Sequence, residues 1–243
     1  MRTNRLLTVV LAGSLVVAAC GGAQDTATTT DSTPATVTTV PLGAVPSGYV
    51  GYLHQPTACG AGQPDPATDM KFDAPGDVGL TGRTILILNT SCGSIEIQLD
   101  PEAAPEATNS FVFLAESGFF DGTVSHRVIP GFMMQAGDPT ATGLGGPGYT
   151  LPDEFPAEGT TYVRGIVAMA NAGPGTTGSQ FFIMLGDADW LGPQYTIVGH
   201  VISGLETLDR IAEVPLGRGG NSADPSQSTP LESIYIESVS IQR

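Results

Sequence analysis

Positive charge is scarce in this sequence of 243 residues. Nine Lys and Arg residues stand against 24 Asp and Glu residues, and Lys71 is the single lysine. A chain with so little positive charge lacks the basic patch that attracts nucleic acid or an anionic membrane surface. We therefore expect no nucleic-acid partner. Attachment to a membrane would come from a lipid anchor rather than from a basic surface.

The N-terminal hydrophobic run, Leu6 to Val17, is too short to cross a membrane as a helix. It follows two arginines and ends in Val17-Ala18-Ala19-Cys20, so residues 1–19 are expected to be a secretory signal. These four residues resemble the lipobox of bacterial lipoproteins. Lipid on Cys20 would anchor the exported protein to the outer face of the bacterial cytoplasmic membrane. The alternative is a plain cleaved signal with an unmodified cysteine.

Cysteine is also rare, with three residues in the whole chain. If Cys20 carries lipid, Cys59 and Cys92 remain, and in an exported protein they are free to pair. A disulfide between them would stabilise the fold by roughly 3–4 kcal/mol through the entropy of the unfolded chain. We favour this disulfide over two free thiols. The three histidines show no spacing typical of metal ligands, so no metal site is predicted.

A catalytic nucleophile is missing as well. The sequence contains no Gly-x-Ser-x-Gly motif, and no cysteine lies beside a residue that could act as its base. The carboxylates are scattered through expected loops and strand faces, so none is singled out as an acid or base. A hydrolase therefore has no residue set to support it.

The chain divides into segments of different composition. Residues 20–46 are rich in Thr, Ala and Pro and have few large apolar residues, so we expect a disordered tether. Residues 47–80 are an extension that could dock onto a domain through Tyr49, Tyr52, Leu53 and Phe72, held there by a bridge from Cys59 to Cys92. The folded domain is expected at residues 81–243.

Hydrophobic periodicity predicts the first elements of that domain. Residues 84–88 form a continuous apolar run, as in a strand buried on both faces. Residues 94–99 alternate between apolar and polar side chains, as a half-buried strand does. Pro101 and Pro105 then predict the start of a helix that extends to about Ser117, with Gly118 at its end.

The rest of the domain is expected to be mostly short strands. Residues 124–201 contain short strands and Gly-rich loops, and Ser203-Gly204-Leu205-Glu206 matches a capping box that opens a second helix. A polar loop at residues 217–230 leads to a last alternating strand at residues 234–241. Many short strands with two isolated helices indicate a mainly antiparallel sheet closed on itself.

Residues 126–138 place a fixed cation among apolar side chains. A short strand at residues 128–129, a tight turn and a second strand from Phe132 to Gln135 are expected. Alternation then places Phe132 and Met134 on one face, and Met133 and Gln135 on the other. Arg127 is a permanent donor beside this surface, which suits an apolar substrate that carries one polar atom. The alternative is an ordinary hairpin with a solvated arginine.

A second stretch, residues 170–183, combines small residues with two amides. Its glycines would let a ligand backbone approach closely, while Asn171 and Gln180 offer hydrogen bonds and Phe182 offers an aromatic wall. Trp190 and Leu191 follow shortly afterwards. Each of these pieces alone also fits an ordinary core or turn.

Together these stretches resemble the cyclophilin family of peptidyl-prolyl isomerases, over about residues 82–243. The resemblance implies a closed eight-stranded antiparallel β-barrel capped by two α-helices. Residues 121–122, 137–139 and 145–149 are similar to bacterial members in particular. The matching motifs are residues 126–138, Asn171-Ala172-Gly173-Pro174, Gly178-Ser179-Gln180-Phe181-Phe182-Ile183, Trp190-Leu191 and Val198-Gly199.

The resemblance also assigns roles to residues. Arg127 matches the catalytic arginine of the family, and Trp190 is associated with the binding of cyclosporin-type inhibitors. Ser125, Ala136 and Val198 depart from residues common in the family. The positions that match its substrate-binding groove are His126, Phe132, Met133, Gln135, Ala170, Asn171, Ala172, Gln180, Phe182, Trp190, Leu191 and Tyr195.

The implied activity is rotation about X–Pro peptide bonds in exported proteins, which assists their folding and requires no metal or cofactor. The arginine would stabilise the twisted prolyl amide. The alternative is a non-catalytic chaperone or scaffold that holds proline-containing segments in the same groove.

Overall fold

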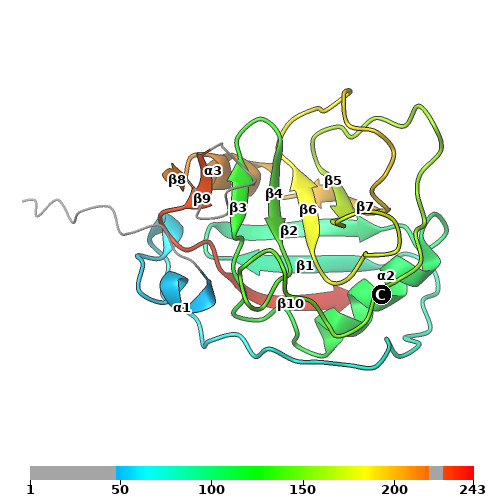
Figure 1. The fold of residues 1–243 in the computed structure, drawn as a ribbon, viewed down its shortest axis with the longest axis horizontal. Coiled ribbons are helices and arrows are strands. Elements are labelled where there is room, and N and C mark those ends of the chain that lie inside the picture. Colours follow the sequence, from blue (N-terminus) through cyan, green and yellow to red (C-terminus); the bar gives the residue numbers. More distant parts are fainter. Residues whose placement is uncertain (1–47, 219–226) are drawn as a thin grey trace, which may run out of the picture. The chain divides into compact units, whose positions relative to one another are not determined.

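The computed structural model describes residues 48–218 and 227–243 (Figure 1). The predicted signal at residues 1–19, the lipidation site Cys20 and the tether at residues 20–46 lie outside the described residues. Within the two described ranges, no helix is long and apolar enough to cross a membrane.

Eight antiparallel strands form the main sheet, in the order β10-β1-β2-β7-β5-β6-β4-β3 (Figure 1). The strand number and the predominance of β-structure agree with the sequence prediction. The strands are β1 (Ile85–Thr90), β2 (Gly93–Leu99), β3 (Arg127–Ile129), β4 (Met133–Ala136), β5 (Ile166–Met169), β6 (Phe181–Met184), β7 (Ile197–Ser203) and β10 (Ile236–Gln242).

The sheet is open, so the predicted closure into a barrel is wrong. Its edge strands β3 and β10 do not pair with each other. The chain segments that lead into these strands meet at a single bridge between Val124 and Tyr235, where the N–H of Ser125 donates to the carbonyl of Ile234. β3 begins after this bridge and contains three residues. The bridge is therefore not extended into a ladder of hydrogen bonds between β3 and β10.

Both predicted helices are present as α2 (Pro105–Glu116) and α3 (Leu205–Ala212). No local side chain caps the start of α2; instead the carboxylate of Glu154 accepts the N–H groups of Glu106 and Ala107 at 3.0 and 2.9 Å. The end of α2 is as predicted, because Gly118 has φ +71° and its N–H donates to Ala115.

The predicted capping box before α3 does not form. Ser203 is the last residue of β7 and pairs with Glu96 of β2, so its side chain caps no helix. Gly204 is the N-cap, with φ +92°. A Cβ atom at Gly204 would lie 2.3 Å from the carbonyl oxygen of Ser94, so the close packing of the two segments requires glycine there.

Four smaller elements were not predicted. Helix α1 (Tyr49–Tyr52) and the short 3₁₀ helix η1 (Ala58–Gly60) lie in the extension. The expected polar loop at residues 217–230 instead has strands at its two ends, β8 (Leu216–Arg218) and β9 (Gln227–Pro230), which pair as a separate two-stranded sheet. The residues between them, 219–226, lie outside the described part of the chain.

The extension is bound to the domain at its N-terminal part. Tyr52 is 1% exposed, and its hydroxyl donates to the carbonyl of His126 at 3.2 Å. Its own carbonyl accepts a hydrogen bond from the Ser233 hydroxyl at 2.7 Å. Cys59 and Cys92 form a disulfide, which closes a loop with a sequence separation of 33. The chain-entropy model gives such a bridge roughly 3–4 kcal/mol of stabilisation.

The remainder of the extension follows α2. Figure 1 shows this segment in cyan running past β10 and α2. The rings of Phe72 and Phe113 meet edge to face, with their centroids 5.1 Å apart. The N–H of Val78 donates to the Asn109 side chain at 3.0 Å. Residues 48–80 are therefore packed against the domain along much of their length.

Candidate functional site

Strand register places the central site residues in one row. Arg127 of β3 lies opposite Gln135 of β4, and Gln135 lies opposite Phe182 of β6. Because directly opposed residues of antiparallel strands point to the same face, the guanidinium, the amide and the aromatic ring share one side of the sheet. Met133 precedes Gln135 by two residues and therefore lies on the same face, opposite Met184.

The other face of the same strands belongs to the main core. Val128, Met134 and Ile183 alternate with the site residues and are fully buried against the helices and the remaining strands. The site is thus the outer side of strands whose inner side stabilises the fold.

Phe132 does not share a face with Met134, contrary to the prediction. Strand β4 begins at Met133, and Phe132 lies in the turn that includes Gly131 with φ +74°. The turn directs Phe132 onto the apolar cluster around Met133. Alternation therefore does not apply to this residue, although Phe132 is still part of the predicted site.

An apolar cluster forms one part of the site. Phe182 is 5% exposed, and the ring of Tyr195 meets it edge to face at a centroid distance of 5.4 Å. Trp190 is 67% exposed and its ring lies 4.8 Å from that of Phe132. The other members are Ile129, Met133, Tyr162, Ile166, Ala168, Ala170, Met184, Ala188, Leu191 and Ile197.

A cavity of about 490 Å³, lined by glycines and by several polar side chains, forms the other part. The side-chain amide of Gln135 donates to Gln180 Oε1 at 2.9 Å, and Gln180 Nε2 donates to the carbonyl of Gly145 at 2.9 Å. Asn171 donates to the carbonyl of Gln194 at 2.9 Å. Gln135, Ala170, Asn171, Ala172 and Gln180 all line this cavity.

The sequence prediction missed some residues at the site. Met184 could have been found, because it lies two residues after Phe182 in the same strand. Tyr162 exchanges hydrogen bonds with the backbone of Tyr195 across a long sequence separation, which no local pattern reveals. Lys71 also lines the cavity, although it belongs to the extension.

The site thus joins an apolar cluster, an arginine and amide groups. Comparison with known proteins identifies the family. The family model for cyclophilin type peptidyl-prolyl cis-trans isomerases matches residues 85–241. The chain belongs to the cyclophilin family. It is accordingly an enzyme, a cyclophilin-type peptidyl-prolyl cis-trans isomerase.

Similar proteins occur in a bacterium and in an animal. Peptidyl-prolyl cis-trans isomerase B of Streptomyces anulatus is 43% identical over 172 residues, which cover 64% of this chain and 94% of the relative. Peptidyl-prolyl cis-trans isomerase-like 3 of Homo sapiens is 40% identical over 157 residues, or 63% and 93% of the two chains.

Among solved structures, a cyclophilin of Cryptosporidium parvum is similar, with a TM-score of 0.59 and 33% identity. The match covers 67% of this chain and 99% of that one. The same protein was also solved in the presence of the dipeptide Ala-Pro, with a TM-score of 0.59 and 34% identity.

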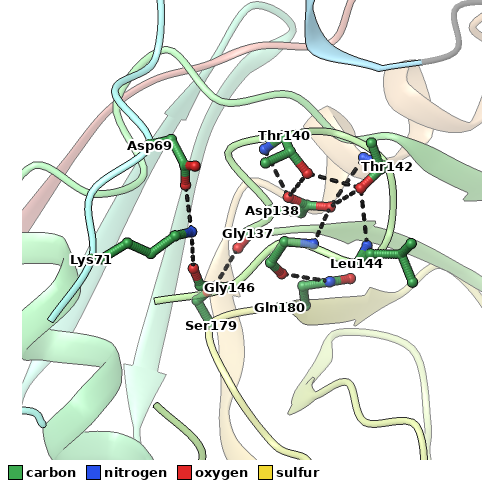
Figure 2. Close-up of polar contacts among 11 residues, drawn as sticks. Asp69, Lys71, Gly137, Asp138, Thr140, Thr142, Leu144, Gly146, Ser179 and Gln180 are labelled. Carbon is green, nitrogen blue, oxygen red and sulfur yellow. Dashed lines mark hydrogen bonds and ion pairs between the residues drawn. The ribbon is translucent and has the colours of Figure 1, made fainter. Parts of the chain in front are cut away.

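A buried carboxylate organises the loop beside the cavity of this cyclophilin (Figure 2). Asp138 accepts hydrogen bonds from the hydroxyl and N–H of Thr140, both at 2.7 Å, and from the N–H groups of Thr142, Gly143 and Gly145. Burial alone would raise the pKa of Asp138, but the Thr140 and Gly145 hydrogen bonds hold it below its ordinary value. The ionised carboxylate therefore fixes the cavity wall.

His126 is held in its neutral form beside this carboxylate. Burial lowers the pKa of His126 to about 4; the charge of Asp138 opposes this shift, and that of Arg127 adds to it. Its Nδ1 atom is buried without a hydrogen-bond partner among the described residues. Of the neighbouring pair His126 and Arg127, only Arg127 then carries a positive charge at neutral pH.

We predict that His126 makes the stability of this cyclophilin depend on pH. The unfolded histidine titrates near pH 6.5 and the folded one near pH 4, so the unfolded state binds more protons between these values. The free energy of unfolding should therefore fall as the pH is lowered through this window, by on the order of 2 kcal/mol from His126 alone.

Urea denaturation at about pH 7 and about pH 4.5 measures this contribution. His126→Gln, which carries no titrating group, should lose that part of the pH dependence. His54→Gln removes an exposed histidine and serves as the matched control. An identical pH dependence in the wild type and His126→Gln would contradict the prediction.

Proposed function

We propose that this isomerase acts on X–Pro bonds of exported proteins and that Arg127 is its catalytic residue. The observation that carries the second part is the register of Arg127, Gln135 and Phe182, which puts a permanent donor on the same sheet face as Phe182 of the apolar cluster. The amides of Gln135 and Asn171 stand on the polar side, where they would hold the backbone of a bound segment.

The chemistry of the X–Pro bond matches such a site. Amide resonance holds the bond planar with a barrier of about 18–20 kcal/mol, whereas its cis and trans forms differ by about 1 kcal/mol. Only the barrier needs to be lowered. In the twisted transition state the prolyl nitrogen regains a lone pair, which can accept a hydrogen bond that the planar amide nitrogen cannot.

A guanidinium group that donates to this nitrogen binds the twisted state better than the planar one, and such differential binding accelerates the reaction. In this proposal Phe132, Met133 and Phe182 hold the prolyl ring and exclude water, which strengthens the hydrogen bond in the apolar surroundings. Leu191 and Tyr195 complete the walls. Trp190, exposed on Phe132, is the proposed contact for a cyclosporin-type inhibitor.

Arg127→Ala should lower kcat/KM for a short X–Pro peptide by about 100-fold, because it removes the donor to the transition state. Peptide affinity, measured through the fluorescence of Trp190, should change much less, since the pocket remains. Trp190 is the single tryptophan of the chain. NMR exchange spectroscopy of the cis and trans peptide signals gives the rate.

Arg83→Ala is the matched control, because Arg83 is an exposed arginine that donates to Gln98, outside the site. Arg127→Lys keeps the charge without the planar fork and should show an intermediate rate. Equal rates for Arg127→Ala and the wild type would contradict the role of Arg127.

The proposed location is the outer face of the bacterial cytoplasmic membrane, with lipid on Cys20. The signal at residues 1–19 and the lipobox motivate this proposal, and the disulfide between Cys59 and Cys92 supports it, because disulfides persist outside the reducing cytosol. Residues 20–46 would then separate the enzyme from the membrane and let it reach the proline-containing segments of exported proteins.

Cys20→Ser should move the protein from the membrane fraction to the soluble fraction of producing cells, because it removes the site of lipidation. Mass spectrometry of the wild-type protein should find lipid on an N-terminal Cys20. An unmodified N-terminus beyond Cys20, or unchanged membrane partition of the variant, would show that the anchor is absent.

A further inference from the structure

The extension contributes the only lysine of the chain to the wall of this cavity. Figure 2 shows Lys71 between Asp69 and Gly146. The ammonium group of Lys71 donates to the carbonyl of Gly146 at 2.7 Å and to Asp69 Oδ1 at 2.6 Å. Residues 48–80 precede the part of the chain that the cyclophilin family model matches. Lys71 is therefore an addition to the groove by the extension of this chain.

The position of Lys71 is fixed by its neighbours. The N–H of Phe72 donates to the carbonyl of Pro147 at 2.7 Å, and its ring packs on Phe113. A Cβ atom at Gly148 would lie 2.7 Å from the carbonyl oxygen of Phe72, so the two backbones are in close contact. The extension is thus held against residues 146–148, directly beside Lys71.

Lys71 is also the one charged residue among those that line the cavity in the described part of the chain. The remaining lining groups are small or neutral, notably Gln135, Asn171 and Gln180. The chain has 24 acidic residues, but no carboxylate is found among the described residues that line this cavity. An ammonium group has three N–H donors, and the contacts with Gly146 and Asp69 use two of them.

We propose that Lys71 makes this cavity a subsite for an acidic side chain, so that the enzyme prefers segments with Asp or Glu close to the proline. The inference rests on the proposed function, because the cavity adjoins the pocket assigned to the prolyl ring. A substrate carboxylate would take the third donor or replace Asp69. The ion pair with Asp69 is about half exposed, so exchanging one carboxylate for the other costs little.

The experiment uses peptides with one proline and either Glu or Gln at each position from about three residues before it to about three after it, a range that an extended chain spans within roughly 20 Å. NMR exchange gives kcat/KM, and Trp190 fluorescence gives Kd. At one position the wild type should prefer Glu over Gln by about 2- to 5-fold at low ionic strength. Added salt should reduce this preference because it screens the exposed charge.

Lys71→Met should abolish the preference, since it keeps the apolar stem of the side chain and removes the charge. Arg83→Met makes the same change in net charge at an exposed residue outside the cavity and should retain it. Asp69→Asn should increase the preference, because it removes the carboxylate that competes for Lys71.

The proposal would be overturned if the ratio of kcat/KM for the Glu and Gln peptides were the same in the wild type and in Lys71→Met at every position. An equal fall in kcat/KM for both peptides in Lys71→Met would also overturn it, because Lys71 would then shape the cavity without distinguishing a charged side chain from a neutral one. A preference in Kd that depends on Lys71, in a protein that does not accelerate exchange, would uphold the subsite and refute the proposed catalysis.

Discussion

The antiparallel register of β3, β4 and β6 is the constraint on which the site depends. It aligns Arg127, Gln135 and Phe182 on one face and buries Val128 and Met134 on the other. A slip of one residue would exchange the two faces and place an arginine in the main core. The packing that stabilises the sheet therefore also keeps the donor, the amide and the apolar wall together.

Polar contacts extend this order from the strands to the loops. The carboxylate of Asp138 binds the backbone of the loop up to Gly145, and the carbonyl of Gly145 holds Gln180, which in turn holds Gln135. The N-terminal extension packs on the outside of the domain, to which it is attached through the Cys59–Cys92 disulfide and the buried Tyr52. The cavity wall thus combines segments that are far apart in the sequence.

Much of the fold and of the site could be predicted from the sequence, because alternation along β2 and the Pro and Gly signals of α2 are local. The resemblance to cyclophilins rests on separate motifs, and the structure places Arg127, Gln135 and Phe182 from two of them side by side. Features set by tertiary contacts could not be predicted. The sheet remains open because the segments before β3 and β10 pair only at the bridge between Val124 and Tyr235. Ser203 does not cap α3 because it pairs with Glu96 of β2. Phe132 leaves the expected face because it lies in a turn. Lys71 reaches the cavity through contacts that no local pattern reveals.

The central claim is that one face of the sheet binds proline, where Arg127 donates a hydrogen bond to the prolyl nitrogen of the twisted amide. A crystal structure of the protein with an X–Pro peptide tests this most directly. The prolyl ring should lie against Met133 and Phe182, with the guanidinium of Arg127 within hydrogen-bond distance of the prolyl nitrogen, about 3 Å. A peptide bound elsewhere, or a ring in the pocket with Arg127 directed away from it, would contradict the account.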